Sequence, residues 1–105
     1  MLASMIRSIS SKSDIPANTA VILDFYADWC GPCRTIAPVY ERLSQDYKQV
    51  TFLKVNVDKA PELAEAYAIK AVPTFILLKR GEVFARVSGD SVKLVRELSK
   101  LAGLT

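Results

Sequence analysis

The apolar and polar positions of the chain follow two spacings, one typical of strands and one typical of helices. Residues 21–26 are apolar except for Asp24, and such a run suits a central strand that is covered on both faces. Residues 51–57 alternate between apolar and polar side chains and predict another strand. Ahead of both, residues 2–9 predict a first edge strand, and residues 10–16 open a short helix.

Apolar residues at helical spacing predict two helices in the middle of the chain. The first covers residues 32–47 and should kink at Pro38, because proline removes a backbone hydrogen bond. Its apolar positions are Ile36, Val39, Tyr40, Leu43 and Tyr47. The second helix begins near Pro61, since proline fits the first turn of a helix. Its apolar positions are Leu63, Ala64, Tyr67 and Ala68.

A hairpin and a final helix complete the pattern. Strand-like runs at residues 74–78 and 83–87 are joined by a short glycine turn, which is the spacing of an antiparallel hairpin. Gly89 ends the second run, and Asp90 or Ser91 can cap a closing amphipathic helix. The apolar positions of this helix are Val92, Val95, Leu98 and Leu101.

The order β-α-β-α-β-α-β-β-α predicts an α/β fold in which a mixed five-stranded sheet is flanked by four α-helices. A chain of 105 residues can bury one core, so we expect a single domain over residues 1–105. No apolar run approaches the roughly 18 residues of a membrane span. The 14 basic and 11 acidic residues are interspersed, which argues against a nucleic-acid partner.

The chain contains no histidine, and this narrows the chemistry that it can perform. The usual general base of cysteine and serine hydrolases is missing, and so is the commonest nitrogen ligand of zinc. Carboxylates and lysines are left to transfer protons.

The chain has two cysteines, and they stand two residues apart in the run Trp-Cys-Gly-Pro-Cys at residues 29–33. A thiol pair at this spacing, between a strand and a helix, can open and close a disulfide, so redox exchange is the leading hypothesis. A zinc site completed by carboxylates, a structural disulfide and two inert buried cysteines are the alternatives. A disulfide across so short a loop would constrain the unfolded chain little.

The predicted helix start suggests different roles for the two thiols. Cys30 lies at the helix N-terminus, where unpaired N–H groups and the helix dipole favour a thiolate, so we expect it to be the nucleophile. Cys33, in the first turn and further from solvent, would be the resolving thiol that attacks the mixed disulfide. Gly31 and Pro32 set the turn, and Trp29 would shield the pair from water on one side.

Asp24 is a carboxylate within an apolar strand. If it is buried, desolvation raises its pKa toward neutrality, and it could take the proton of Cys33. Alternatively, Asp24 occupies an edge or bulge position and faces water. Lys54 could pair with Asp24 across neighbouring strands or point outward. Pro73 can be an ordinary turn proline, and the residues alone do not predict a cis bond there.

Together these residues resemble the thioredoxin family over essentially the whole chain. Residues 24–34, Asp-Phe-Tyr-Ala-Asp-Trp-Cys-Gly-Pro-Cys-Arg, and residues 36–38, Ile-Ala-Pro, are similar to the active-site strand and kinked helix of the family. The run Val-Pro-Thr at residues 72–74 is similar to its restrained loop, and residues 79–82 to its last hairpin. The resemblance implies the thioredoxin fold.

The resemblance also implies a site around a redox disulfide between Cys30 and Cys33. The implied catalytic residues are Cys30 as nucleophile, Cys33 as resolving thiol, Asp24 in proton transfer and Lys54 as the neighbour that modulates Asp24. Pro73 is implied to be cis and to face the cysteines. The implied residues of a shallow groove for extended target segments are Trp29, Gly31, Pro32, Val72, Pro73 and Gly89.

The implied activity is that of a protein-disulfide reductase. Its partners would be thioredoxin reductase, which uses FAD and NADPH, and disulfide-containing targets such as peroxiredoxins, ribonucleotide reductase and methionine sulfoxide reductase. The chain itself would bind no cofactor or metal, and a monomer is the default. Gly31 and Pro32 look like the insert of reducing family members, whereas a histidine there makes the disulfide more oxidising.

Two rival functions remain, a non-redox binding subunit with this fold and a disulfide oxidase or isomerase. Two residues depart from the family pattern. Tyr26 stands where tryptophan is familiar, and it should preserve the packing while adding a hydroxyl that needs a partner. Ser88 stands where an apolar groove residue is expected, which leaves target preference open. We expect a cytoplasmic location, since two cysteines and no export signal suit a reducing compartment. The basic, serine-containing residues 1–13 leave an organelle as an alternative.

Overall fold

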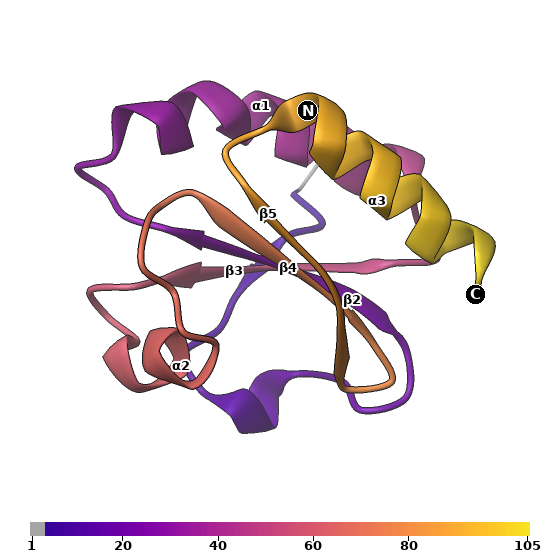
Figure 1. Ribbon diagram of the computed structural model, residues 1–105, viewed down its shortest axis with the longest axis horizontal. Coiled ribbons are helices and arrows are strands. Elements are labelled where there is room, and N and C mark those ends of the chain that lie inside the picture. Colours follow the sequence, from indigo (N-terminus) through magenta and orange to yellow (C-terminus); the bar gives the residue numbers. More distant parts are fainter. Residues whose placement is uncertain (1–3) are drawn as a thin grey trace.

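Five strands form one mixed sheet with the spatial order β1-β3-β2-β4-β5 (Figure 1). This computed structural model describes residues 4–105. The strands are β1 (Arg7–Ser8), β2 (Ala20–Tyr26), β3 (Thr51–Asn56), β4 (Thr74–Lys79) and β5 (Glu82–Ser88). β1, β3 and β2 run parallel to one another, whereas β4 is antiparallel to both β2 and β5. The predicted mixed five-stranded sheet is therefore confirmed.

The helices cover both faces of this sheet (Figure 1). They are α1 (Gly31–Asp46), α2 (Pro61–Ala66), α3 (Ser91–Gly103) and the 3-10 helix η1 (Lys12–Asp14). Buried side chains of α1 and α3 pack against one face, while those of α2 and the partly buried Ile15 after η1 pack against the other. Within residues 4–105, no helix has both the length and the apolar character needed to cross a bilayer.

β2 lies at the centre of the sheet and is covered on both sides, as its apolar run, interrupted only by Asp24, predicts. Ala20 and Ile22 contribute to the core beneath α1 and α3. Val21, Leu23 and Phe25 alternate with them and contribute to the core on the α2 face. All five are at most 4% exposed, so removing apolar surface from water stabilises both faces of this strand.

The prediction of four α-helices is wrong for the first of them. In place of an α-helix over residues 10–16 the structure has η1, which is capped by the Ser11 side chain and buries none of its residues. Without an apolar face to pack, so short a segment cannot sustain an α-helix. The first strand is also shorter than the predicted 2–9, since β1 contains only Arg7 and Ser8, and residues 1–3 lie outside the described part.

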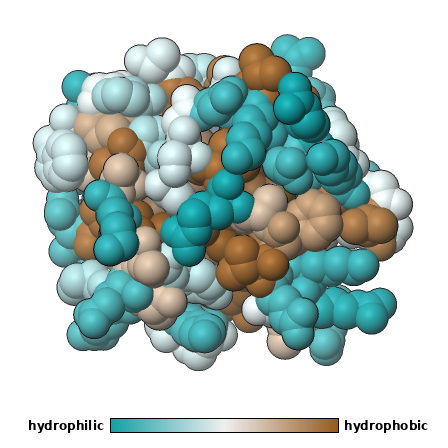
Figure 2. Space-filling view, viewed as in Figure 1, coloured by the Kyte–Doolittle hydropathy of each residue, from teal (hydrophilic) through white to brown (hydrophobic). Residues whose placement is uncertain are grey.

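The apolar stripe of α3 differs from the predicted one. Val92 and Val95 are 67% and 37% exposed, so they do not belong to the core. Leu94 is fully buried together with the predicted Leu98 and Leu101. These three leucines follow the i, i+4, i+7 spacing of one helix face, and the two valines lie beside that face. The hydrophobic residues visible among hydrophilic ones in Figure 2 likewise show that part of the apolar surface stays exposed.

The fold places three chain segments at one edge of the sheet. α1 begins shortly after β2 ends, and the loop before β4 reaches the same edge because β4 is antiparallel to β2. β3 is parallel to β2 and therefore also ends there. The cysteines, Pro73 and the end of β3 are brought together at this edge.

Candidate active site

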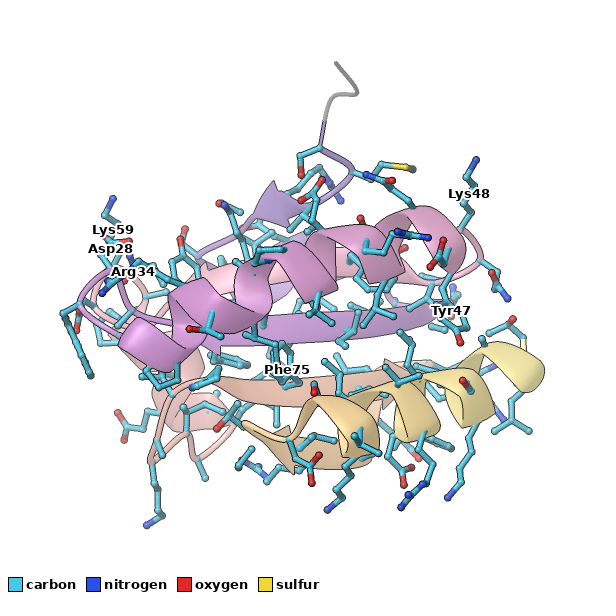
Figure 3. All side chains as sticks on the ribbon, turned by 90° about the horizontal axis from the view of Figure 1, so that it is seen from above. Asp28, Arg34, Tyr47, Lys48, Lys59 and Phe75 are labelled. Atoms are coloured by element: carbon cyan, nitrogen blue, oxygen red, sulfur yellow. A yellow bond between two sulfur atoms is a disulfide. The ribbon has the colours of Figure 1, made fainter. Side chains whose placement is uncertain are left out.

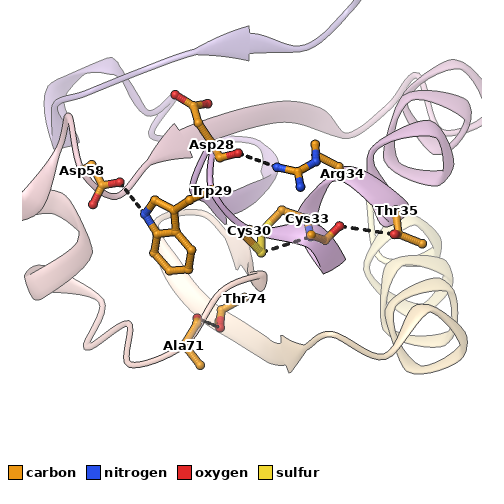
Figure 4. Close-up of a disulfide and its surroundings, with 10 residues drawn as sticks. Asp28, Trp29, Cys30, Cys33, Arg34, Thr35, Asp58, Ala71 and Thr74 are labelled. Atoms are coloured by element: carbon orange, nitrogen blue, oxygen red, sulfur yellow. Dashed lines mark hydrogen bonds between the residues drawn. A yellow bond between two sulfur atoms is a disulfide. The ribbon is translucent and has the colours of Figure 1, made fainter.

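Cys30 and Cys33 form a disulfide at the start of α1 (Figure 4). Their Cα atoms are 5.2 Å apart. Cys30 is the N-cap residue of α1, and its Sγ atom accepts a hydrogen bond of 3.1 Å from the backbone N–H of Cys33. An N-cap side chain normally supplies an oxygen to these free N–H groups, and here a sulfur takes that place.

The helix start favours negative charge on Cys30 rather than on Cys33. Free N–H groups and the helix dipole stabilise an anion at the N-cap, and the effect falls off within the first turn. Pro32 stands in that first turn, where its missing N–H costs no hydrogen bond. The local structure thus supports Cys30 as the thiol that is more readily deprotonated.

Solvent exposure does not separate the two cysteines. In the disulfide form Cys30 is 3% exposed and Cys33 is 6% exposed, so the expectation that Cys33 lies further from solvent is wrong. Both pack in a small apolar cluster with Ala27, against which Val57 and Val72 also lie. The difference between the thiols comes from their positions relative to the helix dipole.

Trp29 is 69% exposed, and its ring is held by a hydrogen bond. Its Nε1–H donates to Oδ2 of Asp58 at 2.9 Å (Figure 4). Asp58 is positioned in turn because its backbone N–H donates to Oδ1 of Asn56 at 2.9 Å. The sequence analysis missed Asp58 and Asn56 as site residues. The only signal was that a carboxylate directly follows the end of a strand.

The peptide bond between Val72 and Pro73 is cis, as the resemblance implied. Pro73 lines a groove together with Gly31, Pro32 and Gly89, so it lies beside the insert between the cysteines. Val72 packs against the cysteine cluster itself. The loop before β4 is therefore part of the site.

Asp24 is buried, with 7% of its surface exposed, at the centre of the sheet. This overturns the alternative of an edge position facing water. It lies between Lys54 on β3 and Phe75 on β4 in the strand register, and Oδ1 of Asp24 has no hydrogen-bond partner among the described residues. Burial raises the pKa of Asp24 to about 7, although the charge of Lys54 opposes the shift.

Lys54 is opposite Asp24 in the register but forms no ion pair with it among residues 4–105. Its ammonium instead lies over the ring of Tyr26, with Nζ 5.8 Å from the ring centroid. The half-buried Tyr26 thereby contacts the neighbour of Asp24, and Tyr26 also lines a small hollow with Asn56 and Lys59.

Tyr40 is a buried polar group that the sequence analysis counted only as an apolar position of α1. Its hydroxyl donates to the backbone carbonyl of Leu53 at 2.7 Å and lies 3.2 Å from that of Ile22. Burial and the charge of Asp24 raise the pKa of Tyr40 well above its usual value, so it stays protonated. The signal in the sequence for a buried hydroxyl was a tyrosine at an apolar position of the predicted helix.

A disulfide at the N-terminus of α1, together with a buried carboxyl group in β2 whose pKa is about 7, is the combination expected of a thiol–disulfide exchange site. The family model described as Thioredoxin matches residues 6–100. The chain belongs to the thioredoxin family and has the thioredoxin fold.

The similarity to individual proteins covers nearly the whole chain. The chain is 39% identical over 100 residues to thioredoxin of Chlamydia trachomatis, covering 91% of this chain and 98% of that protein. It is 44% identical over 92 residues to a Caenorhabditis elegans peptide-N(4)-(N-acetyl-beta-glucosaminyl)asparagine amidase, covering 88% of this chain but only 15% of the amidase.

Among solved structures, a chain from a study of the thiol resolving mechanism in yeast mitochondrial 1-Cys peroxiredoxin via glutathione/thioredoxin systems is similar in fold. It matches with a TM-score of 0.88 and 30% identity, covering 94% of this chain and 100% of that one.

Proposed function

We propose that this protein is a protein-disulfide reductase that cycles between a Cys30/Cys33 dithiol and the disulfide. The observation that supports this proposal most directly is the position of the Cys30 sulfur. It caps the N-terminus of α1, where it accepts a hydrogen bond from the backbone N–H of Cys33. The Gly31-Pro32 insert contains no histidine that would make the disulfide more oxidising, which supports reduction as the direction.

In the first step the Cys30 thiolate attacks one sulfur of a target disulfide. A bond forms between Cys30 Sγ and that sulfur, the target disulfide breaks, and its other sulfur leaves as a thiolate that takes up a proton. The helix N-terminus stabilises the attacking thiolate. The product is a mixed disulfide between the two proteins.

In the second step Cys33 resolves the mixed disulfide. Its thiol loses a proton, its sulfur attacks Sγ of Cys30, and the target sulfur leaves as a thiolate that takes up a proton, so the target ends as a dithiol. We propose that Asp24 accepts the Cys33 proton, because its pKa of about 7 lets it exchange protons near neutral pH. Lys54 modulates Asp24 through its charge.

The oxidised protein needs an external reductant. We propose a thioredoxin reductase that passes an electron pair from NADPH through FAD to the Cys30–Cys33 disulfide, while this chain holds neither cofactor nor metal. Proposed targets are peroxiredoxins, ribonucleotide reductase and methionine sulfoxide reductase, of which peroxiredoxin has support in the structure that resembles this chain. Extended target segments would lie across Trp29, Val72, Pro73 and Gly89.

We further propose that the protein acts as a monomer in the cytoplasm, with a mitochondrion as the alternative. Both compartments are reducing, which suits a dithiol donor. Microscopy of a tagged chain at native expression checks the location.

The decisive experiment is turnover of insulin disulfides with NADPH and a thioredoxin reductase. Cys30→Ser should abolish turnover, whereas Cys33→Ser should accumulate a mixed disulfide with the target. Full turnover by Cys30→Ser contradicts the proposal. A reduction potential well above that of glutathione would instead support an oxidase or isomerase, and partner binding unchanged in the double-serine variant would support a binding subunit.

A further inference from the structure

Two hollows of different size flank the disulfide. The smaller, about 170 Å³, lies between Trp29 and the loop at Val72. The larger is an open groove of about 850 Å³ that starts beside Pro32 and Pro73, follows α1 and ends at the start of α3. We call the larger one the α1 groove and define it by Pro32, Arg34, Ile36, Val39, Pro73 and Ser91.

We propose that the α1 groove binds the extended segment of a target protein that flanks its reactive cysteine, and that this segment carries an apolar side chain and a carboxylate. The proposal rests on the proposed reductase function and adds the class of target sequence. The volume of the groove lies in the range of roughly 300–1,000 Å³ that is typical of ligand clefts.

The position of the groove argues for a target segment as its occupant. Gly31 and Pro32 line its near end, and they are the two residues between the cysteines. A target sulfur bonded to Cys30 is about 2 Å from Sγ, so the neighbouring residues of the target must lie across this end of the site. A target bound to Cys30 therefore has residues next to its reactive cysteine within reach of the groove.

The lining of the groove favours an apolar side chain. Ile36 and Val39 are three residues apart on α1 and share one face of the helix. Val39 leaves 38% of its surface exposed although it belongs to the apolar stripe predicted for this helix. An apolar side chain from a target would remove this surface from water.

Arg34 supplies the charge at the rim. Its Nη1–H donates to the backbone carbonyl of Asp28 at 2.7 Å, which holds the guanidinium beside the site, and Figure 3 shows both residues at the same end of the molecule. Within residues 4–105, no carboxylate forms an ion pair with Arg34. Its remaining N–H donors are thus suited to a carboxylate of the target.

The test uses disulfide-bridged peptides that differ only next to the reactive cysteine, one with Leu and Glu and one with Gly and Gln. Each kcat/KM is divided by that for hydroxyethyl disulfide, which is too small to occupy the groove. We expect the full-length protein to favour the Leu-Glu peptide about tenfold. Arg34→Gln and Val39→Ser should each remove most of this preference.

Val83→Ser is the matched control, because Val83 is a 53% exposed valine on β5 that does not line the groove. It should keep the full preference. Equal kcat/KM for the two peptides, or a preference that survives both groove variants, overturns the proposal. The proposal is also overturned if the wild type sediments as a dimer and the Val39→Ser variant sediments as a monomer, since a second copy would then occupy the groove. Failure to reduce hydroxyethyl disulfide and insulin marks failure of the proposed function itself.

Discussion

Asp24 and Tyr40 are buried polar groups on the same face of the sheet, and they differ in how their polar atoms are satisfied. The Tyr40 hydroxyl donates to the Leu53 carbonyl, whereas Oδ1 of Asp24 has no partner among the described residues. A satisfied buried hydroxyl stays neutral and joins α1 to the sheet. An unsatisfied carboxyl group costs stability but can change its charge near pH 7.

This contrast distinguishes Tyr40, a structural polar group, from Asp24, for which we propose a role in proton transfer. Unpartnered buried polar atoms are rare in folded proteins, and strongly shifted pKa values gather at functional sites. Asp24 combines both properties on the face of the sheet that α1 covers, and α1 carries Cys33. This cost to the fold supports the proposed role of Asp24 in proton transfer.

The largest expected effect is on the pH dependence of stability. The pKa of Asp24 is raised from 3.8 to about 7 in the folded state, so the folded protein binds more protons than the unfolded chain between these values. The stability that Asp24 contributes is fully present below about pH 4 and is lost as pH rises from about 4 to about 7, by up to about 4 kcal/mol. Urea unfolding of the oxidised protein across this range measures the slope.

Asp24→Asn is the control for this slope. The chain has no histidine that would titrate in the same window, so the variant should show a nearly flat stability between about pH 5 and pH 8. It should also be more stable than the wild type at pH 8, because no buried charge forms. A wild-type slope that persists in Asp24→Asn contradicts the raised pKa.

The next effect concerns resolution of the mixed disulfide. If Asp24 accepts the Cys33 proton, Asp24→Asn should slow the release of a trapped target at pH 7 by about 100-fold, the usual range for loss of a general base. The rate should recover partly at higher pH, as hydroxide and water take the proton. Stopped-flow release of a fluorescent target measures it, and an unchanged rate removes Asp24 from the mechanism.

Tyr40→Phe should affect stability but not chemistry. Loss of the hydroxyl leaves the Leu53 carbonyl without this donor and should cost about 1–2 kcal/mol. The shape of the pH–rate profile should match that of the wild type. A profile that shifts in Tyr40→Phe would show that the two buried groups are not separate in function.

The smallest effect is expected for Lys54→Met. Its charge opposes the shift of Asp24, so removing it should raise the pKa of Asp24 further. NMR titration of the side-chain carboxyl carbon of Asp24 measures this pKa directly. Lys48→Met, on the loop after α1, is the control because it changes the charge by the same amount. A lower pKa in Lys54→Met contradicts the contribution assigned to Lys54.

Local patterns predicted most of the elements because each depends on residues close in sequence. The central strand followed from an apolar run, and the hairpin from a turn in which Arg80 and Gly81 both have positive φ. The start of α1 followed from Pro32. The prediction of a first α-helix was wrong because a short segment with no buried face lacks stabilising tertiary contacts.

What the sequence determined by itself is the pair of thiols at a helix N-terminus, since the spacing of Cys30 and Cys33 and the insert between them are local properties. The tertiary structure decided the rest of the site. The burial of Asp24, the hydrogen bond from Trp29 to Asp58 and the exposure of Val39 all depend on which elements pack together. Desolvation and surface exposure are set by neighbours distant in sequence, so no local pattern specifies them.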